Sequence, residues 1–209
     1  MKQLFTSRNT ITFLAIATLS GCAATSEPDG PTAPTYAELQ AELTDVADEM
    51  ASVYAQGSTP VAAFTNGTVT YSGYVQHTVG GSIGIGEVVP SIPPTETVLG
   101  ELTVSADFNS SGISASIYNL VSDTRGSMPG TLGGQGQIDY VGTGEAANFT
   151  FDVTGSLLIN GRPASYDGGL NGTFYGTSPD LVFVGVDGTI HHLSGGTEDF
   201  DLTGYALVD

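Results

Sequence analysis

The chain has 209 residues with 22 acidic and 4 basic side chains, which gives a formal net charge of −18 at pH 7. So few basic residues cannot form a basic patch, and a nucleic-acid-binding function is therefore excluded. The single cysteine excludes a disulfide framework and a multi-cysteine zinc site, and the length suits one domain with short appendages.

The N-terminus has the pattern of a bacterial lipoprotein signal. Lys2 and Arg8 precede an apolar run over residues 11–19, and the sequence Leu19-Ser20-Gly21-Cys22 then supplies a small-residue cleavage site before cysteine. The apolar run is about half as long as a membrane-spanning helix requires, so a transmembrane anchor is disfavoured. We therefore expect residues 1–21 to be a signal peptide and Cys22 to carry the lipid that anchors the protein. A buried free thiol in an uncleaved chain is the alternative.

The residues around this cysteine bear on location and charge. Ala23 follows it, and in lipoprotein signals a residue other than aspartate there implies transfer to the outer membrane. Cleavage would leave Arg125 and Arg162 as the basic residues against 22 acidic ones, a formal charge of 2 − 22 = −20. Such a surface repels anionic head groups and favours solubility. It fits either a salty habitat, where salt screens repulsion between like charges, or a cationic partner.

A tether and a helix are predicted next. Residues 22–34 contain three prolines and no apolar periodicity, which is typical of a flexible, extended tether. The helix is predicted over 35–57, because the capping-box pattern Thr35-x-x-Glu38 is followed by apolar residues at steps of three and four. These are Tyr36, Leu39, Leu43, Val46, Met50 and Val53. We expect the helix to dock on its own domain, although the spacing also allows a short self-associating coil.

From residue 60 onward the apolar period becomes alternating, which predicts β-strands. One face of the first strand carries Val69, Tyr71, Gly73, Val75, His77 and Val79. The strand at 102–108 forms a hairpin with the strand at 113–117 through the turn at 109–112, and Asn160-Gly161 is a second favoured hairpin turn. Further strands are predicted at 134–142, 147–159, 165–175, 181–191 and 199–208, which gives about eight strands.

Glycines within these strands would weaken a flat sheet but help a sheet to bend and close on itself. They are Gly73, Gly155, Gly172, Gly185 and Gly204. Closure also removes exposed edge strands. We therefore predict an all-β fold in which residues 60–209 form a single eight-stranded antiparallel up-and-down β-barrel, preceded by the tether and one short α-helix. The interior of such a barrel is either filled by side chains or holds one small ligand.

One family resemblance is carried by a stretch in the second half of the barrel. It consists of Gly169-Leu170-Asn171-Gly172-Thr173-Phe174-Tyr175-Gly176, followed by Pro179, Gly185 and Gly188. The stretch resembles the β-barrel domain of the transferrin-binding protein B family, in which a Gly-x-Phe-Tyr-Gly strand end leads into a glycine-containing strand. The order of lipidated cysteine, tether and barrel is also similar. The resemblance implies a surface-exposed, non-enzymatic binding lipoprotein.

The resemblance does not extend to a particular ligand. Family members bind host transferrin, haemoglobin, complement regulators or haem, and the binding loops are the parts that do not match here. The family usually has an Ala-x-Glu-like sequence after the Phe-Tyr-Gly, where this chain has Asp180-Leu181-Val182. Larger members also have two lobes, whereas this chain has room for one barrel.

Three other patterns could carry chemistry. Gly80-Gly81-Ser82-Ile83-Gly84 matches the nucleophile elbow G-x-S-x-G, but the glycines that follow cannot begin the helix that this motif needs. It opens a long irregular stretch, residues 80–97, which we expect to be either an exposed recognition loop or disordered. Glu198-Asp199-Phe200-Asp201 places Asp199 and Asp201 on one strand face, which suits a polar surface as well as calcium.

The histidines are weak candidates for ligand binding. His191 and His192 are adjacent on a strand and point to opposite faces, so they cannot hold one metal together. His77 shares a face with Tyr71, and a single histidine could ligate haem. No catalytic residue, metal site or cofactor is predicted. We expect a non-enzymatic, lipid-anchored outer-membrane module that binds a protein or small molecule, with a structural envelope lipoprotein or a haem-binding barrel as alternatives.

Overall fold

The computed structural model describes residues 33–79, 95–140 and 146–209. This part of the chain forms one α-helix, α1 (Tyr36–Tyr54), one short 3-10 helix, η1 (Val61–Ala63), and a sheet. The strands are β1 (Thr68–Val79), β2 (Glu96–Asp107), β3 (Gly112–Ser122), β4 (Gly126–Tyr140), β5 (Ala147–Ile159), β6 (Arg162–Tyr175), β7 (Leu181–His192), β8 (Thr197–Asp199) and β9 (Leu202–Val208).

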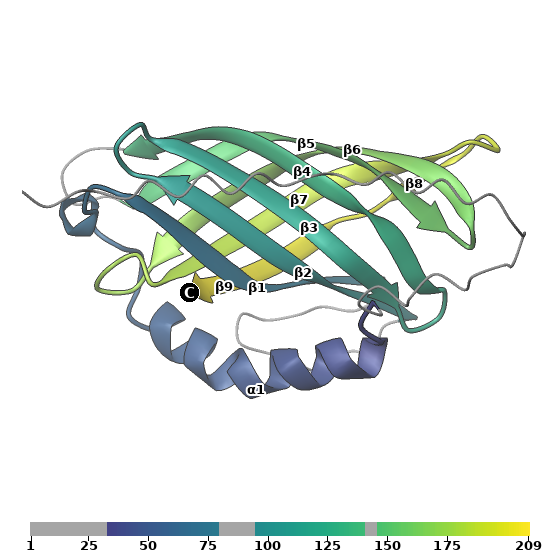
Figure 1. Ribbon diagram of the computed structural model, residues 1–209, viewed down its shortest axis with the longest axis horizontal. Helices are drawn as coiled ribbons and strands as arrows, with labels where there is room; N and C mark the ends of the chain where they lie inside the picture. Colours follow the sequence, from purple (N-terminus) through teal and green to yellow (C-terminus); the bar gives the residue numbers. More distant parts are fainter. Residues whose placement is uncertain (1–32, 80–94, 141–145) are drawn as a thin grey trace, which may run out of the picture. The chain divides into compact units, whose positions relative to one another are not determined.

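The sheet closes into a barrel (Figure 1). Each strand from β1 to β7 pairs antiparallel with the next one along the chain. Strands β8 and β9 both pair with β7, and β9 also pairs with β1. Because β8 and β9 are two pieces of one strand, interrupted at Phe200 and Asp201, the ring has eight strands. The predicted eight-stranded up-and-down barrel is confirmed.

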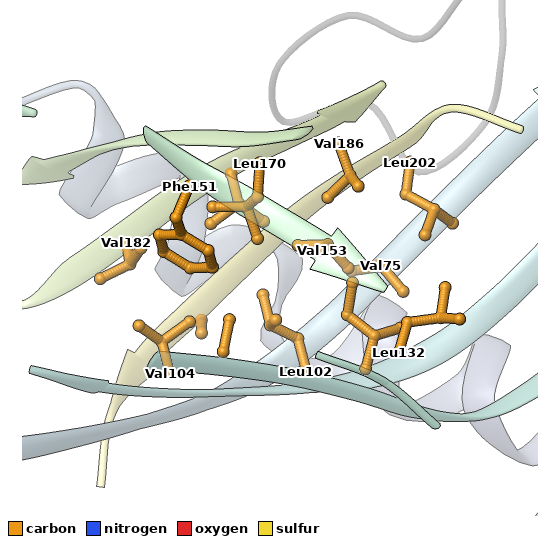
Figure 2. Close-up of a cluster of buried hydrophobic side chains, with 14 of the residues drawn as sticks. Val75, Leu102, Val104, Leu132, Phe151, Val153, Leu170, Val182, Val186 and Leu202 are labelled. Atoms are coloured by element: carbon orange, nitrogen blue, oxygen red, sulfur yellow. The ribbon is translucent and has the colours of Figure 1, made fainter. Parts of the chain in front are cut away.

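The barrel interior is a hydrophobic core. Alternating residues of β5 are buried and exposed from Ala147 to Thr154, as expected for strands with one apolar face. Figure 2 shows inward side chains converging from β1, β2, β4, β5, β6, β7 and β9. They include Val75, Leu102, Val104, Leu132, Phe151, Val153, Leu170, Val182, Val186 and Leu202, all within one cluster of buried residues. Of the two interiors that the sequence allows, the structure has the one filled by side chains.

Two inward-facing glycines make room for large rings in this core. A Cβ atom on Gly172 would lie 2.2 Å from Cζ of Phe149, and a Cβ atom on Gly188 would lie 2.2 Å from Oη of Tyr166. Real Cβ atoms do not approach other atoms so closely, so any side chain would displace these rings. The Gly172 of the Gly-x-Phe-Tyr-Gly sequence therefore has a packing role.

Strand β4 begins eight residues before the predicted strand at 134–142. The residues missed by the prediction include Pro129 and Gly130, which normally argue against a strand. In the structure they lie opposite the single residue Asn119, at an irregularity in the pairing of β3 with β4. Proline is tolerated at such a bulge because the ladder is already interrupted there. The other predicted strands differ at their ends, and the one at 199–208 is broken after Asp199.

Helix α1 lies on the outer wall of the barrel. Its capping box is present: the backbone N–H of Glu38 donates to Oγ1 of Thr35 at 3.3 Å, and the backbone N–H of Thr35 donates to Oε2 of Glu38 at 2.7 Å. Leu39 is fully buried and packs with Leu99 and Val121 of the barrel wall. The helix therefore docks on its own domain as expected. No helix in the described part of the chain has the length and hydropathy to span a bilayer.

Candidate functional site: the mouth of the barrel

The two ends of the barrel are closed differently. One end, the plugged end, is filled by Phe64, whose ring lies 5.1 Å from Phe108, 5.6 Å from Tyr140 and 5.2 Å from Phe174 between ring centroids. Thr59 is fully buried and fixes the segment before the plug, because its backbone N–H donates to the Phe174 carbonyl at 2.8 Å. This end presents a packed aromatic cluster to the barrel interior.

The other end, which we call the mouth, carries a charged network. It is the end of the barrel that carries the turns between β3 and β4, between β5 and β6, and between β7 and β8 (Figure 1). The Arg125 guanidinium donates from Nε and Nη2 to Glu96 at 2.6 and 2.8 Å. It also donates from Nη1 and Nη2 to Glu198 at 3.0 and 2.5 Å. One arginine therefore bridges β2 and β8, which are far apart in sequence.

The network shifts the pKa values of its members. Hydrogen bonding to Arg125 lowers the pKa of Glu96 below its usual value, and burial opposes this shift only in part. For Glu198, burial acts to raise the pKa, but the hydrogen bond and charge of Arg125 outweigh it and the net shift is downward. Oε2 of Glu198 also lies 3.4 Å from Nε2 of His192. With one guanidinium against two carboxylates, the network has a net charge of −1 when His192 is neutral.

A pocket adjoins this network at the mouth. It lies between the β5–β6 hairpin and the β7–β8 turn, and its volume is about 530 Å³. It is lined by Ile159, Asn160, Arg162, Pro163, His192, Leu193 and Ser194. Arg162 is exposed and forms no ion pair with any residue that the structure describes, and Leu193 is 81% exposed. The pocket offers hydrogen-bond donors and apolar contacts, the combination that is typical of pockets for small ligands.

The three histidines do not come together. His77 lies in the core, where its ring is 4.6 Å from Phe200 and its Nδ1 donates to the Asp201 carbonyl at 2.5 Å. His191 is exposed on the outer wall opposite Ser165, whereas His192 is half-buried at the mouth. Their predicted placement on opposite faces is confirmed, and only His192 lines the pocket.

The remaining sequence candidates have other roles or cannot be placed. Asp199 and Asp201 are exposed while Phe200 is buried, as the pattern predicts. Oδ1 of Asp201 accepts from the backbone N–H of Gly188 at 3.2 Å. Within the described ranges no three acidic, histidine or cysteine side chains are placed to hold a metal ion. Cys22 and the Gly80–Gly84 motif lie outside the described residues.

Sequence reasoning missed the residues that close the two ends. Arg125 could have been noticed as one of only two basic residues after Cys22, but its partners at 96 and 198 leave no local pattern. Phe64 is an isolated aromatic residue between the helix and the first strand, and only the closed barrel shows where it inserts. Comparison of the chain with models of known protein families gave no match, and neither did comparison with curated proteins.

Proposed function

We propose that this protein is a lipid-anchored binding module of the bacterial outer membrane, similar in kind to the transferrin-binding protein B barrels, which engages its partner at the mouth and outer wall. The observation that carries the proposal is the filled interior. A barrel whose lumen is a hydrophobic core offers binding groups only on its surface. The mouth has the pocket, the guanidinium donors of Arg162 and the imidazole of His192.

The anchor is part of the proposal, and it rests on Cys22. Two or more acyl chains hold a protein on a bilayer stably, because each buried methylene contributes about 0.8 kcal/mol. The tether of residues 22–34 would separate the domain from the membrane surface. This arrangement leaves the barrel accessible to a protein or small-molecule partner.

The anchor is tested by labelling with palmitate. Wild-type protein expressed in cells is expected to incorporate labelled palmitate and to fractionate with the outer membrane. Cys22→Ser is expected to lose both properties, whereas Ser20→Ala, a change on the other side of the cleavage site, retains them. Label that persists in Cys22→Ser would overturn the anchor.

The main alternative is a structural envelope lipoprotein, which would also be consistent with a packed interior. The two are distinguished by whether the barrel is accessible on the surface of intact cells. Antibodies against the barrel are expected to bind intact cells as strongly as permeabilised cells. Binding that requires permeabilisation would favour the structural alternative.

Haem ligation has a test of its own. His77→Ala, His191→Ala and His192→Ala are each titrated with haem alongside the wild type. We expect no Soret shift in any of them, because His77 is enclosed by the core and the other two lie on different surfaces. A wild-type shift lost in one variant would instead support the haem-binding barrel.

A further inference from the structure

Helix α1 touches the barrel wall tightly near its two ends. Near its start, Leu39 packs with Leu99 and Val121. At its end, the ring of Tyr54 stacks on Tyr175 with 4.4 Å between centroids and meets Tyr205 edge-on at 6.5 Å. Between these contacts a cavity of about 220 Å³ separates the helix from the wall. The middle of α1 therefore bridges a hollow.

The wall beneath this hollow carries an acidic side chain flanked by two tyrosines. In the register of the sheet Tyr74 of β1 pairs with Glu101 of β2, and Glu101 pairs with Tyr118 of β3. All three are half-buried and line the cavity, with Val46 and Met50 of α1 on the opposite side. The cavity thus combines aromatic and apolar walls with two carboxylates, those of the half-buried Glu101 and the exposed Asp209.

Negative charge surrounds the same cavity. The Tyr74 hydroxyl donates to Oε2 of Glu42 at 3.2 Å. Burial, followed by the charges of Glu42, Glu101 and Asp45, raises the pKa of Tyr74 to about 12. Glu101 accepts from the neutral amide of Asn119. In the described chain the two arginines are both at the mouth, one of them held by two glutamates, so no basic side chain is paired with these carboxylates.

We propose that this cavity binds the cationic head group of an organic ammonium compound, with Glu101 as the counter-charge and the rings of Tyr74 and Tyr118 as aromatic walls. Ammonium groups are attracted to aromatic rings, and sites that recognise quaternary ammonium ligands combine several rings with apolar surroundings. The volume is below the roughly 300–1,000 Å³ of pockets that enclose a whole drug-sized ligand, so the head group enters and the rest stays outside. The net charge of −18 steers cations toward the protein. The proposal does not depend on the lipid anchor.

The test compares two probes of the same shape and different charge. Choline and its neutral isostere 3,3-dimethylbutan-1-ol are titrated into the labelled protein, and backbone amide shifts are followed by NMR. Choline is expected to give saturable shifts at the middle of α1 and around Tyr74, Glu101 and Tyr118. The alcohol is expected to bind at least about tenfold more weakly. Equal affinities, no saturable choline shifts, or shifts spread evenly over the acidic surface would each overturn the proposal.

Variants assign the binding to the cavity. Tyr118→Leu is expected to weaken choline binding between about two- and thirty-fold, the range of a cation–π contact. Glu101→Gln removes the counter-charge and is expected to weaken choline binding at least about twofold. The matched control is Asp152→Asn, which removes one carboxylate from an exposed position on β5. It should leave the affinity unchanged. Far-ultraviolet circular dichroism confirms that each variant is folded, and unchanged affinity in both folded cavity variants would contradict the assignment.

Discussion

The two ends of the barrel achieve closure by opposite means. At the plugged end, Phe64 packs against the uncharged rings of Phe108 and Phe174, and this packing does not depend on pH or salt. At the mouth, Arg125 joins two carboxylates that respond to pH and salt. The plugged end should therefore contribute mainly to stability, whereas the mouth leaves polar groups exposed to solvent. The following predictions separate the two contributions.

The largest effect is expected from Phe64→Ala. The change empties the centre of the aromatic plug, and we expect it to lower the free energy of unfolding by about 2–3 kcal/mol. This is less than the cost of truncating a fully buried phenylalanine, because Phe64 is half-buried. Urea unfolding followed by circular dichroism measures it. Leu193→Ala at the opposite end is the control, since an 81% exposed side chain should change stability by less than about 0.5 kcal/mol. Equal costs for the two variants would show that Phe64 does not seal the barrel.

Arg125→Met is expected to cost about 1–3 kcal/mol, because it leaves two half-buried carboxylates without their arginine partner. Adding Glu96→Gln and Glu198→Gln to Arg125→Met removes those charges and should restore part of the lost stability. Urea unfolding of the single and triple variants measures the difference. If the triple variant is less stable than Arg125→Met alone, the carboxylates are not the cause of the loss.

A smaller effect is expected at the start of α1, which lies on the mouth side of the barrel (Figure 1). Thr35→Ala removes the side-chain oxygen of the capping box and should destabilise the helix by about 1 kcal/mol. Amide hydrogen exchange should therefore accelerate about fivefold in α1 and stay unchanged in β5. Thr35→Ser retains the oxygen and serves as the control. Acceleration throughout the barrel would indicate that the helix is essential to barrel closure.

The smallest effect is a dependence on acid. Because the folded-state pKa values of Glu96 and Glu198 lie below their unfolded values, the stability that they contribute is present above about pH 4.5 and is lost as the pH falls through the folded-state values. The difference in unfolding free energy between wild type and Glu96→Gln should shrink over that window. Taking the difference cancels the effect of protonating the other carboxylates. If this difference in unfolding free energy does not change with pH, the hydrogen bonds from Arg125 do not lower the pKa of Glu96.

The sequence was sufficient to predict the barrel because alternation is a local signal. The capping box at Thr35 and the turn at Asn160-Gly161 were equally local, and both positions of that turn have positive φ values of 52° and 71°. Strand β4 was predicted too short because Pro129 and Gly130 argue against a strand. Their compatibility with β4 depends on the bulge opposite Asn119, which belongs to another strand.

The candidate sites could not be predicted for a related reason. Arg125 meets Glu198 across 73 positions, and Glu101 meets Tyr74 and Tyr118 only through the register of three strands. Register depends on the closed ring, so these groupings have no spacing of their own in the sequence. The sequence singles out His192 as a candidate ligand residue, but its partner Glu198 and the pocket beside it are visible only in the folded barrel.

The pairing of β9 with β1 also has a consequence for how quickly the molecule folds. Tyr71 pairs with Val208, 137 positions later, whereas the other neighbours in the ring are joined mostly by short connections. Contacts between such distant residues form slowly, because the entropy of closing the intervening chain is lost before the contact forms. Until β9 is in place, β1 and β7 both have unpaired edges and the apolar interior is open to water. Ring closure should therefore be the rate-limiting step of folding, and the interval before it the period of greatest vulnerability to aggregation.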